Sequence, residues 1–126
     1  MESNMIGWFE IPVTDMDRAR KFYESVFDIQ IEVQNFHGLM MGLFPFAERK
    51  QGASGALVSH PDFYRPSESE GPLLYFSSRD VQEQVDKIEG AGGKVIQPKK
   101  MISEDVGYMA LFVDTEGNRL ALHSRQ

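Results

Sequence analysis

At 126 residues the chain has the length of one domain. Its net charge is −6 at pH 7 and its few clustered lysines form no basic face, which excludes a nucleic-acid partner. The absence of cysteine excludes disulfides, thiolate chemistry and Cys-based zinc sites. Because no apolar segment approaches the roughly 20 residues that span a bilayer, and no signal-peptide pattern is present, we expect a cytoplasmic protein with no membrane partner.

The first half of the chain predicts one strand, one helix and three further strands. Residues 6–13 form an apolar strand, and Asp15 is suited to cap a helix, since its carboxylate can accept from the exposed amides of the first turn. Apolar residues then recur at helical spacing, namely Met16, Ala19, Phe22, Tyr23, Val26 and Phe27. The patterns of residues 29–34, 39–44 and 54–59 are typical of strands.

The segment from His60 to Gly71 combines prolines, serines and acidic residues with the adjacent aromatics Phe63 and Tyr64. A pure linker seldom carries two neighbouring aromatic side chains. We therefore expect this connection to pack back on the fold and to cover a cavity.

The second half repeats the order of the first. Asp80 is again placed to cap a helix, which begins at Val81 and ends before the run Gly90–Gly93. Residues 98–106 are expected to be irregular or an edge, and residues 114–118 a hairpin turn. The strands that we expect here are 72–77, 94–97, 108–113 and 119–124.

A shift of 65 positions superimposes the two halves. It places Asp15 on Asp80, Ile31 on Ile96, and Ala56-Leu57-Val58 on Ala121-Leu122-His123. One offset serves both ends of the unit, which predicts an α+β fold of tandem βαβββ modules in a single domain. The expected division is module one at about 5–60, a connection at about 61–71 and module two at about 72–126.

Four sequence features resemble the vicinal oxygen chelate superfamily, which includes glyoxalase I, extradiol dioxygenases and bleomycin-resistance proteins. They are the opening Phe-Glu-Ile-Pro-Val-x-Asp, the helix motif Arg-Ala-x-x-Phe-Tyr, the pair Gly92-Gly93 and the closing segment 114–119. The resemblance implies two modules that curl into an incomplete barrel around a shared cavity, commonly within a homodimer. In the metal-dependent members, four inward side chains hold a divalent ion that stabilises an anionic intermediate.

The same resemblance places the four ligand positions at Trp8, Ala56, Leu73 and Ala121. None of these side chains can coordinate a hard or borderline cation. We therefore expect no metal cofactor, and a divalent ion would need a non-standard site. In the alternative interpretation, Trp8 and Leu73 simply fill the space that the ion occupies in metal-dependent members, and only a reduced pocket remains.

Glu10 and His123 are the candidate catalytic residues. Glu10 lies two residues after Trp8 and His123 two after Ala121, so both share the expected cavity face. A carboxylate in a partly apolar cavity could act as a general base, and His123 could complete an acid–base pair. The alternatives are that Glu10 pairs with Arg119 or sits at the open mouth, and that His123 is a partly exposed packing residue.

The candidate ligand-binding residues are Trp8, Leu73, Tyr75, Met101, Tyr108 and His60. Aromatic side chains give rigid area to a planar ligand, and methionine adapts to irregular shapes. His60 could reach the mouth of the cavity, although His-Pro is also a common way to leave a strand.

Two functions compete on this evidence. The leading hypothesis is a glyoxalase-like protein whose metal-independent cavity binds a small, partly apolar molecule. The alternative is a lyase, isomerase or dioxygenase relative that uses a relocated site around Glu10 and His123. A third possibility is a fold that serves mainly as a dimeric partner module.

Overall fold

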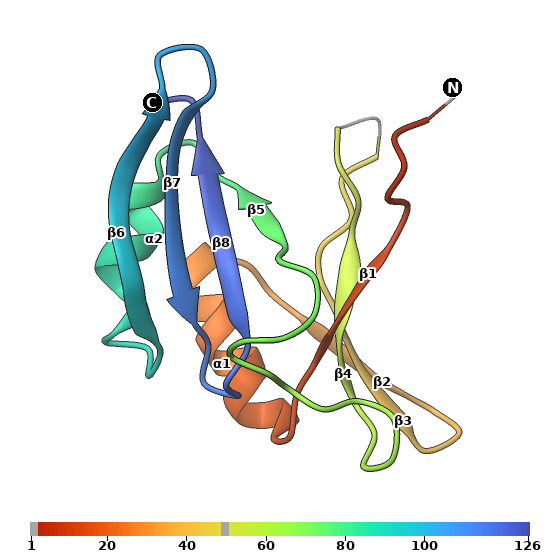
Figure 1. Cartoon of the computed structure of the whole chain (residues 1–126). Helices are drawn as coiled ribbons and strands as arrows, with labels where there is room; N and C mark the ends of the chain where they lie inside the picture. The colour runs from red at the N-terminus through yellow and green to blue at the C-terminus, as the bar shows by residue number, and fades with distance from the viewer. Residues whose placement is uncertain (1–2, 49–50) are drawn as a thin grey trace.

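The computed structural model describes residues 3–48 and 51–126 (Figure 1). The elements are β1 (Phe9–Pro12), α1 (Met16–Phe27), β2 (Glu32–Phe36), β3 (Leu39–Leu43), β4 (Gly55–Ser59), β5 (Tyr75–Ser77), α2 (Val81–Ile88), β6 (Lys94–Ser103), β7 (Gly107–Val113) and β8 (Arg119–Ser124). The predicted α+β class and the twofold βαβββ order are confirmed.

Each half of the chain builds its own four-stranded sheet. The strand orders are β1-β4-β3-β2 in the first sheet and β5-β8-β7-β6 in the second. Figure 1 shows the two sheets meeting near α1 and diverging toward the top of the view. Within the described residues the two sheets do not close into a barrel.

The internal repeat is visible in single hydrogen bonds. The amide of Val13 donates to the carbonyl of Val58 over 2.9 Å, and the amide of Ser78 donates to the carbonyl of His123 over 2.8 Å. Both residues of the second pair lie 65 positions after those of the first. Each bond extends a parallel strand pair, β1 with β4 and β5 with β8. The offset found in the sequence therefore relates equivalent places in the two sheets.

Helix α1 begins and ends where the sequence predicts. The Asp15 carboxylate accepts from the Arg18 amide over 3.1 Å, which satisfies one of the free amides of the first turn. The helix buries Ala19, Phe22, Tyr23 and Val26. It stops at Asp28, whose φ of 54° is left-handed, a conformation that aspartate tolerates better than most residues.

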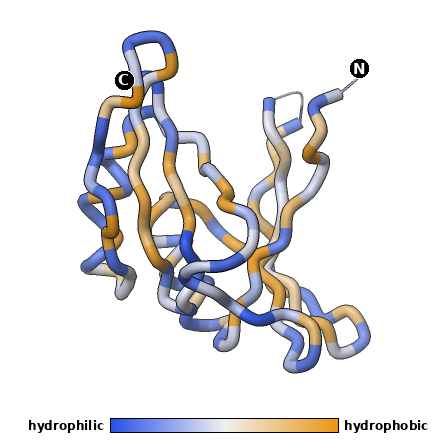
Figure 2. The backbone as a smooth tube through the Cα atoms, viewed as in Figure 1, coloured by the Kyte–Doolittle hydropathy of each residue, from blue (hydrophilic) through white to orange (hydrophobic). Residues whose placement is uncertain are grey.

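The main hydrophobic core lies between the helices and one face of each sheet. Ile11 and Leu57 of the first sheet and Phe112 and Leu122 of the second are completely buried there. Figure 2 shows apolar residues running along β7 and β8. Since side chains alternate along a strand, the residues between them lie on the opposite face, which we call the outer face.

The strand bounds differ from the sequence prediction most clearly in four strands. β1 begins at Phe9, β2 at Glu32 and β5 at Tyr75, each three residues later than expected. Conversely, β6 continues past its predicted end at Gln97 through Pro98 to Ser103, and this segment is at the sheet edge with an irregular register, as the prediction of an irregular or edge segment had it. The sheet accommodates Pro98 because β6 is an edge strand, and its pairing with β7 shifts register between Gln97 and Lys100.

Candidate functional site

The outer face of β1 carries an exposed polar cluster. Glu10 accepts hydrogen bonds from the Tyr64 hydroxyl at 2.5 Å and from the Trp8 indole N–H at 3.3 Å. The hydrogen bond to Glu10 raises the pKa of the Tyr64 phenol, with burial adding to the effect. Trp8 is 47% exposed, so the cluster offers a flat aromatic surface beside a carboxylate. The connection does fold back on the first sheet here, through Tyr64.

In the described part of the chain, no hydrogen bond or ion pair joins Glu10 to His123. Glu10 belongs to the first sheet and is bonded to Tyr64, whereas a ring nitrogen of His123 in the second sheet lies 2.7 Å from the Val106 carbonyl oxygen. Arg119, the other predicted partner of Glu10, donates instead to the Gly71 carbonyl over 3.1 Å. An acid–base pair needs its members within hydrogen-bond reach, so this geometry does not favour the relocated catalytic site.

Leu73 and Tyr75 line a cavity of about 530 Å³ between the edge strands β1 and β5, together with residues 4–6. Tyr75 is also 53% exposed. His60 lines a separate cavity of about 440 Å³, in which Tyr64 also takes part. There the His60 Nδ1 accepts from the Asp62 amide over 3.2 Å.

Met101 and Tyr108 lie opposite each other in the β6–β7 ladder, distant in the sheet order from β5. Tyr108 packs against the hydrophobic core, and the Lys99 ammonium lies 4.6 Å from the centre of its ring. The same ammonium is 2.9 Å from the carboxylate of Asp80, the cap of α2. The structure therefore groups these two candidates with α2 rather than with Trp8.

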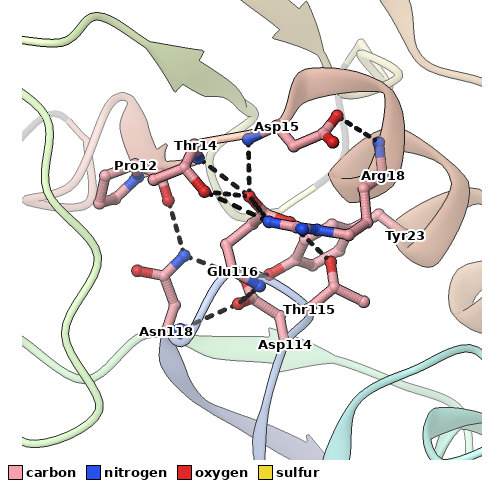
Figure 3. A network of polar contacts seen from close by, with 9 residues as sticks. All are labelled: Pro12, Thr14, Asp15, Arg18, Tyr23, Asp114, Thr115, Glu116 and Asn118. Atoms are coloured by element: carbon pink, nitrogen blue, oxygen red, sulfur yellow. Dashed lines mark hydrogen bonds and ion pairs between the residues drawn. The ribbon is translucent and has the colours of Figure 1, made fainter.

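A second polar network, which the sequence analysis missed, joins the two halves of the chain (Figure 3). The Glu116 side chain is fully buried at the N-terminus of α1, where it accepts from the amides of Thr14 at 2.9 Å and Asp15 at 2.8 Å. Burial raises the pKa of the Glu116 carboxyl. The hydrogen bonds from Arg18, the Asp15 amide and two threonine hydroxyls outweigh burial and lower that pKa to about 2.

The neighbouring Asp114 completes this network. Its carboxylate accepts from the Tyr23 hydroxyl at 2.7 Å and from the Asn118 amide at 2.9 Å, while the Asn118 side chain donates to the Pro12 carbonyl at 2.7 Å. Burial and the Asp114 carboxylate together raise the pKa of Tyr23. The sequence predicted the segment 114–118 only as a hairpin turn. The sign that it could form a polar network was the presence of two acidic residues, Asp114 and Glu116, in one short turn.

Comparison with known proteins decides the family. The family model described as "Glyoxalase/Bleomycin resistance protein/Dioxygenase superfamily" matches residues 5–122. The chain belongs to this superfamily. The resemblance found in the sequence is thereby confirmed.

Relatives of this superfamily member include a putative glyoxylase of Mycobacterium tuberculosis, 30% identical over 120 residues. That match covers 92% of the chain and 44% of the relative, so the chain spans less than half the length of this protein. A glyoxylase-like domain-containing protein of Didymella fabae is 29% identical over 95% of the chain and 93% of its own length.

Solved structures share the superfamily fold. Maize glyoxalase I superposes with a TM-score of 0.74 at 17% identity, over 94% of this chain and 45% of the maize chain. TnmS3, an antibiotic-binding protein from Streptomyces sp. CB03234, superposes with a TM-score of 0.72 at 24% identity, over 100% of this chain and 99% of its own. At these identities the likeness concerns the fold.

The residues at the superfamily's metal positions do not fit a metal ion. Ala56 pairs with Glu10 in the β1–β4 ladder and Ala121 pairs with Tyr75 in the β5–β8 ladder, so equivalent places in both sheets carry a buried methyl group. Trp8 and Leu73 offer no lone pair suited to a divalent cation. Within residues 3–48 and 51–126, no three His, Asp or Glu side chains gather closely enough to hold a metal.

Neither helix in the described part of the chain is long and apolar enough to cross a membrane.

Proposed function

We propose that this protein is a metal-independent, small-molecule-binding member of the glyoxalase/bleomycin-resistance superfamily. Its ligand is a small, partly apolar molecule held against the outer faces of the sheets, around Trp8 and Tyr75. The observation that carries the proposal is the donor set: tryptophan, leucine and two alanines stand where the metal-dependent members have coordinating side chains.

The outer faces have the chemistry that such a ligand needs. Trp8 is 47% and Tyr75 is 53% exposed, and large aromatic side chains supply rigid apolar area at little entropic cost. Glu10 and the Tyr64 hydroxyl add a polar anchor next to Trp8. A partly apolar molecule would therefore find both an aromatic platform and a hydrogen-bonding group.

Two further observations support the proposal. TnmS3, which has this fold and almost the same length, is an antibiotic-binding protein, so the scaffold can hold a small molecule. Trp8 and Tyr75 are also about half exposed in the single chain, and we propose that a second copy closes the pocket in a homodimer. Half-exposed apolar side chains at Ile96 and Ile102 of β6 favour such an interface.

The first test is metal content. Protein purified without chelators should contain far less than one divalent ion per chain by elemental analysis. Its circular dichroism and thermal unfolding should not change when EDTA is added. A stoichiometric, tightly held divalent ion would contradict the proposal.

The second test uses the single tryptophan, which lies in the proposed site. A panel of small aromatic compounds, with and without polar substituents, is screened for quenching of Trp8 fluorescence, and binders are then measured by calorimetry. Trp8→Ala should weaken calorimetric binding about tenfold or more, the usual effect of removing an aromatic anchor. Phe36→Ala removes a similarly exposed ring (45%) from the far edge strand β2 and should leave binding unchanged. Equal effects of the two substitutions would contradict the site.

A further inference from the structure

A third cavity lies between the two modules, and most of its walls are phenylalanine rings. It has a volume of about 310 Å³ and is lined by Phe9 of β1, Phe27 of α1, Phe76 of β5 and Phe44, which follows β3, with a rim from residues 45–47 and 51–54. We call it the aromatic cleft. It adjoins the cavity of Leu73 and Tyr75, with which it shares Phe9 and Phe76.

The aromatic cleft lies on the other side of β1 from Trp8. Phe9 and Phe76 pack against the hydrophobic core, whereas Trp8 and Glu10 lie on the outer face. The cleft therefore lies on the core side of the two sheets, and neither Trp8 nor Tyr75 lines it. It is a separate site from the one proposed above.

The walls of the cleft are fixed by contacts between the rings themselves. The ring of Phe76 lies 4.9 Å from that of Phe27, 6.0 Å from that of Phe44 and 6.0 Å from that of Phe9, centre to centre. The pairs meet at tilted or edge-to-face angles, the arrangements that aromatic rings prefer. Each ring is held by at least one other, so the cleft is formed before a ligand arrives.

The chemistry of the lining selects against charge. Among the described residues that line the cleft, none is ionisable, and the polar side chains are those of Gln51, Ser54 and Ser77. The Ser54 hydroxyl already lies 3.2 Å from the Pro45 carbonyl oxygen, to which it can donate. An ion entering the cleft would lose its hydration with no opposite charge in the described lining to replace it.

We propose that the aromatic cleft binds a small, uncharged, planar aromatic molecule. Ring faces and edges supply the contacts, the absence of ionisable groups from the described lining sets the charge, and the volume limits the ligand to a few fused or linked rings. No metal and no residue of the outer face takes part.

Two fluorescent probes with the same ring skeleton test the charge preference. N-phenyl-1-naphthylamine is uncharged, and 8-anilino-1-naphthalenesulfonate adds one sulfonate. The uncharged probe should bind with one molecule per chain and at least tenfold more tightly than the sulfonate, because the described lining of the cleft offers the anion no partner. Equal affinities for the two probes would overturn the proposal.

A matched pair of substitutions tests the location. Phe46 is 73% exposed and lines the cleft, while Phe63 is 80% exposed and lies in the connection, so neither substitution should unfold the protein. Phe46→Ser should weaken binding of the uncharged probe about tenfold, and Phe63→Ser should leave it unchanged. An unchanged affinity of the Phe46→Ser variant for the probe would overturn the proposal. Loss of probe binding when the protein dimerises would also overturn it, because a second copy of the chain would then fill the cleft. Trp8→Ala should not alter probe binding, which separates this site from the outer face.

Discussion

Arg18 and Glu116 connect the two halves of the chain: Arg18 Nε lies 2.7 Å from Glu116 Oε2, although the residues are 98 positions apart. Arg18 stands in the first turn of α1, where the helix dipole disfavours a cation. The Glu116 carboxylate, which arrives from the turn between β7 and β8, neutralises that cation and also caps two amides of the same helix end. One carboxylate from module two therefore completes a helix of module one.

Replacing Glu116 should destabilise the protein. Glu116→Ala removes the acceptor from Arg18 and from the amides of Thr14 and Asp15, so the free energy of unfolding should fall by roughly 2–3 kcal/mol. The control is Glu83→Ala, which breaks an exposed ion pair with Arg79 and should cost about 0.5 kcal/mol or less. Urea unfolding at pH 7 measures both. Equal losses in the two variants would show that the Glu116 network adds no stability.

The same carboxylate should make stability depend on pH in the acid range. Its pKa is about 2 in the folded protein against 4.5 for the free group, so the folded state favours the ionised form. The stabilisation is then present above pH 4.5 and is lost as the pH falls toward 2. Glu116→Gln cannot ionise, so the stability gap between wild type and this variant should shrink between pH 5 and about 2.5. A gap that stays constant over this range, measured by urea unfolding, would contradict the lowered pKa.

Two glycines near the end of α2 should respond oppositely to a methyl group. A Cβ at Gly93 would lie 2.6 Å from the Phe22 ring and 2.7 Å from the Val113 carbonyl oxygen. Gly93→Ala should therefore lower the free energy of unfolding by about 1–3 kcal/mol, the cost of overpacking. At Gly90 the nearest atom is 3.9 Å away, so Gly90→Ala should be neutral or slightly stabilising. Thermal unfolding of the two variants side by side is the measurement, and a stable Gly93→Ala protein would contradict the close packing.

Much of the fold could be predicted because local signals agree with one another. Asp15 and Asp80 each cap a helix, and the helices then present apolar residues at the expected spacing. The offset of 65 residues also holds for hydrogen bonds between strands. The bounds of β6 were missed because Pro98 is a local signal against a strand, and only the edge position and the register shifts in the fold make it acceptable.

The site was harder to predict, since alternation along a strand gives the face of a residue and not its partner. Glu10 and His123 do leave their strands on the outer faces, but Glu10 finds its hydrogen bond at Tyr64 of the connection and His123 finds its own at Val106 of module two. Tyr108 is an aromatic residue of a core strand, and Lys99 over its ring could not be foreseen from spacing. The buried role of Glu116 depends on a contact across 101 or more positions of the chain, beyond the reach of any local pattern.

The outer face should also mediate self-association, as proposed for the closed pocket. Trp8 and Tyr75 are about half exposed in the single chain, and burying such aromatics is a main source of interface stability. Sedimentation of the wild-type protein should show a dimer at micromolar concentration, with Trp8 emission moving to shorter wavelength as the dimer forms. Tyr75→Ser should weaken the dimer about tenfold or more, whereas Phe63→Ser, at an exposed ring in the connection, should not. A protein that stays monomeric at all concentrations, with unchanged Trp8 emission, would contradict this dimer. A ligand would then bind to outer faces that are exposed to solvent.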